Sequence, residues 1–232
     1  MQNTSETADR ARLLAAVLPH VPFDGWSESA FAAGAADLGL TPDAAKSLCP
    51  RGAVDLAVDY HKAGDQALAA RVPEIEGLRY SEKVAALIRF RLEDADREVV
   101  RRGTTLFALP QNAALGASLI WGTADAIWTA LGDRSDDINW YSKRAILSGV
   151  YGSVVLYWLG DETGGEATAQ FIDRRIAEVM QFEKFKSGIR ANPALRPLSE
   201  GLGRLFSSIR APRPNDPRND LPGIWAAPKE TK

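Results

Sequence analysis

Residues 136–161 constrain the fold of this chain more than any other stretch. They open with polar residues that can cap the free N–H groups of a helix, and from Ala145 to Leu159 they are apolar on nearly every side. A helix without a polar face is stable only when protein covers it all round. The stretch therefore predicts a buried central helix on which the other elements pack.

One side of this expected helix carries four small residues, Ser148, Gly149, Gly152 and Ser153. Glycine inside a helix costs roughly 1 kcal/mol relative to alanine, so a strip of this kind is typical of a face that something approaches closely. The approaching group can be a neighbouring helix, a dimer partner or a ligand. The sequence leaves these three alternatives open.

The rest of the chain is also helical in pattern. Apolar residues recur at helical spacing throughout and strand signals are almost absent, which predicts an all-α protein. With 232 residues the chain can bury a substantial core as one large or two small domains. Its net charge of −2 lacks the basic excess that is typical of nucleic-acid-binding proteins.

Few residues are suited to metal binding or to nucleophilic chemistry. Cys49 is the single cysteine, which excludes a disulfide framework and a cysteine-rich zinc site. The two histidines, His20 and His61, lie far apart in the sequence. Because no constellation of nucleophile, base and orienting group is evident, we expect a protein that is not an enzyme and that holds no metal.

The sequence shows no membrane-spanning or targeting segment. No apolar run reaches the roughly 18 residues of a transmembrane helix. The first ten residues lack the basic and apolar regions of a signal peptide and the arginine-rich character of a transit peptide. These two observations predict a cytoplasmic location.

The N-terminal part predicts a helix-turn-helix-like module over residues 9–72, after a disordered segment over residues 1–8. Four helices are expected, over residues 9–18, 25–38, 41–48 and 52–72. The module resembles that of the tetracycline-repressor family in Trp26-Ser27, in the run from Ala35 to Thr41 and in Tyr60-His61-Lys62. A helix that reads DNA needs side chains that reach bases and phosphates, and the third helix offers Lys46 as its only cation. The expected scaffold thus lacks most of the cations that DNA reading needs. A ligand-responsive transcriptional regulator, which the scaffold alone would fit, is the alternative function.

Residues 80–182 form the second expected region. Its elements are a helix over 80–102, a short turn over 104–110, a helix over 113–131, the central helix and an amphipathic helix over 167–182. The helix over 113–131 and the central helix both mix large apolar residues with small ones, so they can enclose an apolar pocket or simply pack tightly. Asp125 lies within the apolar face of the former helix, where an acid is usually a cap or an ion-pair partner.

The chain becomes basic after this region. Between residues 184 and 213 there are seven lysines or arginines and one acid, Glu200. Apolar side chains recur within this tract at Leu195, Leu198, Leu202, Leu205, Phe206 and Ile209. This pattern predicts an amphipathic helix over residues 190–210 that lies on an anionic membrane surface, and docking on the body or on a dimer partner is the alternative. Residues 211–232, rich in proline, are expected to be a disordered tail.

Three motifs in the second region are distinctive as a set. They are Gly132-Asp133-x-Ser135-x-Asp137-x-Asn139-Trp140-Tyr141-Ser142-Lys143-Arg144, then Leu147-x-x-Val150-Tyr151-x-Ser153, and Phe171-x-x-Arg174-Arg175-Ile176. Together they closely resemble the ubiquinone (coenzyme Q) biosynthesis accessory protein family, the ninth named component of that pathway, in its alphaproteobacterial form. The similarity covers about residues 10–210 and is strongest over residues 112–180.

The resemblance implies a tetracycline-repressor-like fold that forms a homodimer, does not bind nucleic acid and is not an enzyme. It implies a protein that binds isoprenoid lipids, including quinone intermediates, and presents them to the diiron hydroxylase that oxidises demethoxyubiquinone. It implies that the protein has no cofactor besides the lipid. It also implies that the protein lies on the inner face of the cytoplasmic membrane as a peripheral protein, attached through its C-terminal helix.

The resemblance also assigns residues. The partner-binding patch carries over at Asp125, Trp140, Tyr141 and Arg144, and Ile127 occupies a place where some relatives have methionine. The expected lipid-binding residues are apolar or aromatic side chains of the two pocket helices: Leu115, Leu119, Ile120, Trp128, Tyr151, Val154, Val155 and Trp158. The central helix is thus expected to present a partner surface in its first turns and a wall of the lipid pocket or a dimer interface further on.

Overall fold

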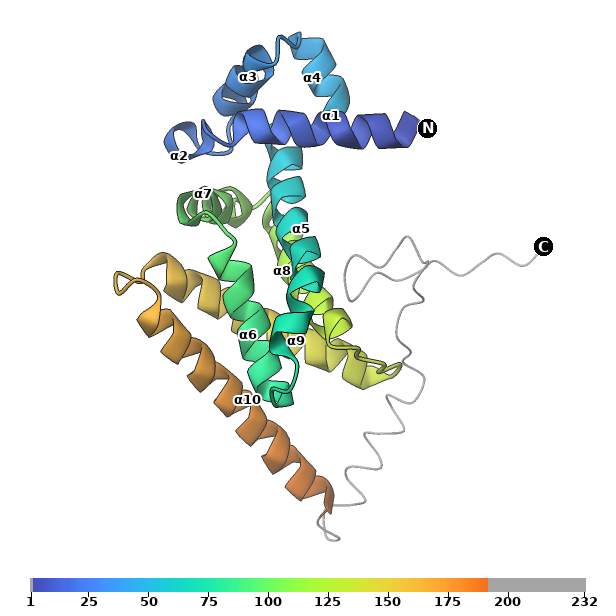
Figure 1. The fold of residues 1–232 in the computed structure, drawn as a ribbon, viewed down its shortest axis with the longest axis vertical. Coiled ribbons are helices and arrows are strands. Elements are labelled where there is room, and N and C mark those ends of the chain that lie inside the picture. Colours follow the sequence, from blue (N-terminus) through green and yellow to red (C-terminus); the bar gives the residue numbers. More distant parts are fainter. Residues whose placement is uncertain (1, 192–232) are drawn as a thin grey trace, which may run out of the picture.

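The computed structural model describes residues 2–191, and the side chains of residues 6–181. Over this range the regular structure is entirely helical, which confirms the predicted all-α class (Figure 1). The elements are α1 (Gln2–Val17), α2 (Val21–Asp24), α3 (Glu28–Asp37), α4 (Pro42–Leu48), α5 (Ala53–Arg71), the 3₁₀ helix η1 (Val72–Ile75), α6 (Tyr80–Glu93), α7 (Arg97–Ala108), α8 (Ala113–Ala130), α9 (Ile138–Leu159) and α10 (Glu166–Ala191). None of the helices in the described part of the chain is long and apolar enough to cross a bilayer.

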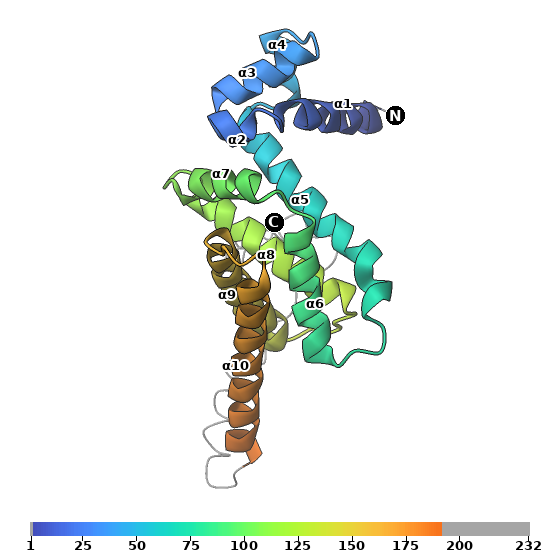
Figure 2. The same cartoon turned by 60° about the vertical axis from the view of Figure 1, so that its left-hand side comes forward.

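Helices α1 to α4 gather at one end of the molecule, and α5 runs from that end into the body (Figures 1 and 2). Helix α4 begins as predicted, because Thr41 Oγ1 accepts a hydrogen bond from the backbone N–H of Ala44 at 3.2 Å. The turn before α4 depends on Gly39, whose φ of +67° is accessible to glycine at little cost. Capping and turn chemistry thus fix the helix-turn-helix outline that the sequence predicts.

Helices α1 and α3 cross at Gly34, where their backbones approach closely. A Cβ atom at Gly34 would lie 2.5 Å from Cγ2 of Val17 and 2.8 Å from the Val17 backbone nitrogen. Both helices bury apolar side chains beside this contact, among them Leu13 and Phe31. The packing of the N-terminal module therefore requires a residue without a side chain at position 34.

The helices differ from prediction at several boundaries: α2 (Val21–Asp24) is additional, α10 continues to Ala191 beyond the expected end at residue 182, and two further differences concern long helices. Helix α1 begins at Gln2, so residues 2–8, expected to be disordered, are helical. The expected helix over 80–102 is broken, because the Asp96 carboxylate accepts from the backbone N–H of Val99 at 2.9 Å and starts a new helix. This new helix, α7, includes most of the expected turn over 104–110. Helical spacing shows neither how far a helix extends beyond its apolar residues nor where a cap divides a periodic run. The first limit applies to α1 and the second to the break at Asp96.

Helix α9 is the central helix of the body, packed between α8 and α10. It buries Tyr151, Val154 and Trp158, but it is not covered all round as predicted. Leu156 is 63% exposed, and a Cβ atom at Gly149 would meet nothing within 4 Å. The small-residue strip is therefore divided: Gly149 faces open space, whereas Gly152 lines a cavity.

Helix α7 joins the N-terminal module to the body. On one side the Trp26 indole Nε1–H donates to the Val99 carbonyl at 3.2 Å. On the other, the Arg101 guanidinium donates to the Leu159 carbonyl, at the end of α9, at 2.8 Å. Helix α7 is thus held from both sides, and in Figure 1 it lies beside α5 and above the end of α9.

We predict that Gly34→Ala lowers the free energy of unfolding by about 1–3 kcal/mol, because the new methyl group overlaps the Val17 backbone. Gly149→Ala is the matched control: its methyl group meets nothing, and replacing a helical glycine should leave stability unchanged or raise it by up to about 1 kcal/mol. Urea unfolding of both variants measures the difference. Equal stability of the two would contradict the close approach of α1 and α3.

Candidate functional site

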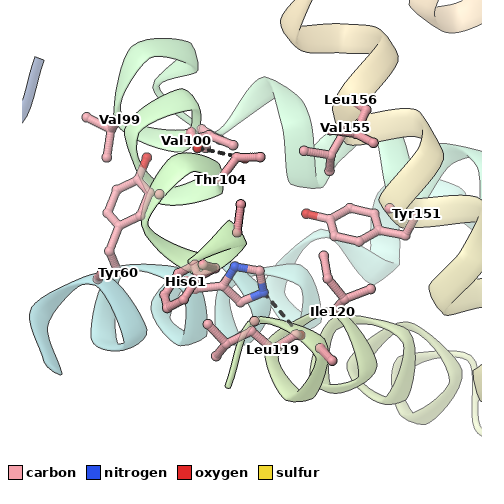
Figure 3. Close-up of a pocket in the computed structure, with 18 of the residues that line it drawn as sticks. Tyr60, His61, Val99, Val100, Thr104, Leu119, Ile120, Tyr151, Val155 and Leu156 are labelled. Atoms are coloured by element: carbon pink, nitrogen blue, oxygen red, sulfur yellow. Dashed lines mark hydrogen bonds between the residues drawn. The ribbon is translucent and has the colours of Figure 1, made fainter. Parts of the chain in front are cut away.

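An apolar cavity of about 330 Å³ lies where α5, α6, α7, α8 and α9 meet (Figure 3). Its apolar lining includes Leu92, Val99, Val100, Phe107, Leu119, Ile120, Val155 and Leu156. The polar groups in its wall are few and include Tyr60, His61, Arg91 and Tyr151. A mostly apolar cavity with a few convergent polar groups is the usual form of a small-molecule site.

The structure brings together four of the eight predicted lipid-binding residues. Leu119, Ile120, Tyr151 and Val155 line the cavity. They lie on the faces of α8 and α9 that turn toward α5 and α7. Their contact with a lipid stays a prediction.

The other four predicted residues lie elsewhere. Val154 and Trp158 are buried in the core, and Leu115 is not part of the cavity lining. Trp128 lines a smaller hollow of about 170 Å³ between α6, α9 and α10, and its Nε1–H donates to the Lys143 carbonyl at 3.1 Å. An apolar side chain on a pocket helix can face either the pocket or the core, and composition does not separate the two.

The sequence patterns do not predict that residues of α5, α6 and α7 line this cavity. Tyr60 and His61 come from α5, Arg91 from α6, and Val99, Val100 and Thr104 from α7. The apolar character of residues 104–110 is a signal of the α7 contribution, but on its own it predicts a short turn. The pairing of α5 with α8 depends on tertiary packing and leaves no local pattern.

The polar groups form a connected network at the floor of the cavity. Arg91 Nε donates to Asp65 Oδ1 at 2.8 Å, and the Thr123 hydroxyl donates to the same oxygen at 2.9 Å. His61 Nε2 lies 2.8 Å from Thr123 Oγ1 and 3.2 Å from the Leu119 carbonyl oxygen. A buried Arg–Asp pair is tolerated when further hydrogen bonds satisfy both partners, as they do here.

Gly64 makes room for this network. A Cβ atom at position 64 would lie 2.5 Å from Cζ of Arg91. The guanidinium therefore rests directly on the α5 backbone, where it also donates to the His61 carbonyl at 3.0 Å. The buried arginine is fixed by α5 on one side and by Asp65 on the other.

Burial keeps both ring groups at the cavity floor uncharged. It lowers the pKa of His61, against an opposing effect of the Asp65 carboxylate, so the imidazole is neutral near pH 7. It raises the pKa of Tyr151 to about 12, although Arg91 opposes this shift. The cavity therefore presents a neutral imidazole and a protonated phenol to a ligand.

The predicted partner-binding patch contains a cluster of aromatic rings. The Trp140 ring lies 4.8 Å from that of Tyr141 and 5.9 Å from that of Trp121, measured between centroids. Trp140 and Tyr141 are half-buried, and Trp121 beneath them is buried. A cluster of this composition is typical of the energetic centre of a protein interface.

Two residues of the predicted patch need correction. Ile127 is 0% exposed and belongs to the core, so it is not available to a partner. Arg144 is also buried: Nε donates to Asp125 Oδ1 at 2.6 Å, and Nη1 donates to Asp133 Oδ2 at 3.1 Å. Arg144 therefore supports the patch from below, with its guanidinium 3.9 Å from the Trp140 ring centroid. The prediction that Asp125 is an ion-pair partner is confirmed.

Asp133 anchors the loop that leads into α9. Burial raises the pKa of this carboxyl, but hydrogen bonds from Lys143, Ser135 and Arg144 outweigh that effect and lower the pKa to about 2. Because the pKa in the folded protein lies below the ordinary value of 3.8, the carboxylate stabilises the fold above about pH 4. This contribution is lost as the pH falls through about 2.

The helix that corresponds to a DNA-reading helix is α4. Its lysine, Lys46, has its amino group 2.9 Å from the Glu28 carboxylate, and Asp43 lies in its first turn. Phosphate contacts need free cationic side chains, so this pairing weighs against nucleic-acid binding.

The predicted membrane-binding residues Leu195, Leu198, Leu202, Leu205, Phe206 and Ile209 lie outside the described residues, as does the predicted tail over 211–232.

We predict that Asp133→Asn lowers the free energy of unfolding at pH 7 by about 1–3 kcal/mol, since it removes one of the two charged acceptors of buried Arg144 and the charged acceptor of half-buried Lys143. The difference from wild type should shrink between about pH 4 and pH 2, where the wild-type carboxylate takes up its proton. Asp136→Asn, in an exposed position of the same loop, should have no comparable effect. A pH-independent difference would contradict the assigned ion pair.

Comparison with known proteins gives a consistent set of relatives. The family model COQ9 matches residues 113–183. The rat "Ubiquinone biosynthesis protein COQ9, mitochondrial" is 31% identical over 188 residues, which are 76% of this chain and 60% of that protein. The Xenopus laevis COQ9-B protein is 31% identical over 191 residues, 76% of this chain and 64% of its own length. The Schizosaccharomyces pombe coq9 protein is 29% identical over 185 residues, with 78% and 73% covered. The chain thus spans about three fifths of the first two relatives.

These relatives correct the predicted location. Their names describe mitochondrial proteins, so the prediction of a cytoplasmic protein on the inner face of the cytoplasmic membrane is wrong. That prediction relied on the composition of the first residues, which does not decide the compartment. The relatives also align well beyond the family match, over about three quarters of the chain. This chain belongs to the COQ9 family.

Proposed function

We propose that this chain is a non-catalytic accessory protein of ubiquinone biosynthesis that binds an isoprenoid quinone intermediate in the cavity between α5 and α9. The observation that carries the proposal is the cavity itself, an apolar space with a small polar floor inside an otherwise packed helical body. Family membership supplies the pathway, since the relatives are named as ubiquinone biosynthesis proteins.

The physical chemistry of such a ligand fits this cavity. A polyprenyl chain leaves water at a gain of about 0.8 kcal/mol for each buried CH₂ group, so a protein that holds it needs an apolar enclosure. A volume of about 330 Å³ is at the lower end of the range for small-molecule pockets and suits a ring with the first isoprene units. Leu156 lines the cavity and is largely exposed, which puts an exit for the remaining chain beside α9.

We assign the aromatic cluster of Trp140 and Tyr141, with Asp125 beside it, to the diiron demethoxyubiquinone hydroxylase as its docking surface. Aromatic side chains at the centre of an interface contribute large contact area at low entropic cost. The buried Arg144 holds Asp125 and Trp140 in a fixed relation, so the surface is arranged before a partner binds.

The sequence supports two further parts of the proposal. The basic, apolar tract over residues 190–210 would attach the protein to an anionic membrane surface. A homodimer contact would use the outward part of the small-residue strip, at Gly149. Gly152, one turn further along α9, lines the cavity instead.

Filling the cavity tests the lipid-binding proposal. Gly152→Leu places an apolar side chain in the cavity wall at a position where a Cβ atom meets nothing within 4 Å. We predict that the variant folds and that isoprenoid lipid co-purified with it, quantified by mass spectrometry, falls at least severalfold. Gly122→Leu, on α8 at a position outside the cavity lining where a Cβ atom also meets nothing within 4 Å, should retain the wild-type amount. Equal lipid content in both variants, or none in the wild-type protein, would refute the assignment.

Removing one aromatic ring tests the docking surface. We predict that Trp140→Ala weakens binding to the hydroxylase by at least tenfold, roughly the 1.4 kcal/mol or more expected of an interface hot spot. Phe23→Ala is the control, because Phe23 is 83% exposed on α2 at the other end of the molecule. Surface plasmon resonance gives the affinities, and thermal unfolding shows that both variants are folded. Unchanged affinity of Trp140→Ala would place the partner elsewhere.

A further inference from the structure

The floor of the cavity holds a histidine whose ring proton can be assigned from its neighbours. Nε2 of His61 faces the Leu119 carbonyl oxygen, the Thr123 hydroxyl and, at 3.6 Å, the Asp65 carboxylate. The carbonyl and the carboxylate accept hydrogen bonds and cannot donate them. The role of the Thr123 hydroxyl therefore decides which ring nitrogen carries the proton.

Thr123 directs its proton away from His61. Its hydroxyl lies 2.9 Å from Asp65 Oδ1, and this carboxylate, paired with Arg91, is the strongest acceptor within its reach. Toward His61 the Thr123 oxygen consequently accepts. Because all neighbours of Nε2 accept, the proton of the neutral imidazole lies on Nε2, and Nδ1 carries a free lone pair.

Nδ1 is on the cavity side of the ring (Figure 3). No described residue hydrogen-bonds to it, and the side chain keeps 18% of its surface exposed although it lies at the floor of the cavity. The Tyr151 hydroxyl points into the same cavity from α9 (Figure 3). The Tyr151 hydroxyl also interacts with the Thr123 side chain, which leaves its oxygen beside His61. One wall of the site thus offers a hydrogen-bond acceptor, and the adjacent wall offers a hydroxyl that can turn toward a ligand and donate.

We propose that His61 Nδ1 and the Tyr151 hydroxyl together bind a hydroxyl group on the ring of the ligand, which donates to Nδ1 and accepts from Tyr151. This inference rests on the proposed function and makes it more specific: the preferred occupant is a phenolic or hydroquinone ring that carries an isoprenoid chain. A fully oxidised quinone offers only carbonyl oxygens, so it leaves the Nδ1 lone pair without a donor. A buried acceptor without a partner lowers affinity.

Three matched probes test the hydroxyl preference on the full chain: a geranylated phenol, its methyl ether and geranylbenzene. The ether keeps the oxygen that accepts from Tyr151 but has no proton for His61, and the hydrocarbon has neither group. Isothermal titration calorimetry should give a dissociation constant for the phenol that is about tenfold lower than that of the ether, the effect of one hydrogen bond to a buried acceptor. The hydrocarbon should bind more weakly than both.

Variants separate the two contacts. His61→Gln keeps an amide group where Nε2 bonds to Thr123 but places no atom at Nδ1, so the phenol should bind no better than the ether. Tyr151→Phe should weaken both oxygen-containing probes to a similar extent and preserve their ratio. Thr105→Val is the control, since Thr105 lies on α7 outside the cavity lining and its hydroxyl already donates to the Arg101 carbonyl at 3.1 Å, so its loss should not change the ratio.

The outcomes distinguish this inference from the proposed function. Preference for the phenol in wild type, lost in His61→Gln, supports it. Equal binding of all three probes by the wild-type protein overturns the hydroxyl preference but leaves lipid binding in place. Preference for the phenol that persists in His61→Gln also overturns the assignment to Nδ1. Failure of all three probes to bind overturns the proposed function and this inference with it.

Discussion

The buried ion pair between Asp65 and Arg91 holds the functional part of this molecule together. It joins α5 to α6, and through the Thr123 hydroxyl it reaches α8, so three helices meet on one carboxylate. Breaking such a pair on one side would leave a buried charge at a cost of several kcal/mol, which makes the spacing of these helices rigid. These polar contacts fix α5, α6 and α8 on one side of the cavity. The apolar space between the helices can therefore remain open without collapse of the core.

The cavity lies where the N-terminal module meets the helical body. Residues of the helix-turn-helix-like end reach it through Tyr60 and His61 on α5, while α8 and α9 supply the opposite wall. Helix α7 closes the junction, held to Trp26 on one side and to the end of α9 on the other.

Much of the fold follows from local patterns that the sequence displays. The all-α class, the Thr41 cap, the ion-pair role of Asp125 and the central position of α9 were predictable because periodicity and capping are short-range signals. The cavity was only half predictable. Val154 and Trp158 share their helix and their chemistry with Tyr151 and Val155, and only the tertiary arrangement of the helices around α9 decides which pair faces the cavity. Arg144 shows the same limit: a charged residue beside Trp140 suggested an outward surface, yet two acids bury it.

The position of a bound isoprenoid tests the account most directly. A geranylated phenol with a photoreactive diazirine on its chain can be cross-linked to the full-length protein, and the modified residues can be located by peptide mass spectrometry. The account predicts modification within residues 99–107, 116–120 and 151–156, the segments of α7, α8 and α9 that surround the cavity. Cross-links confined to the smaller hollow around Trp128 and Met180, or scattered over the surface, would contradict it.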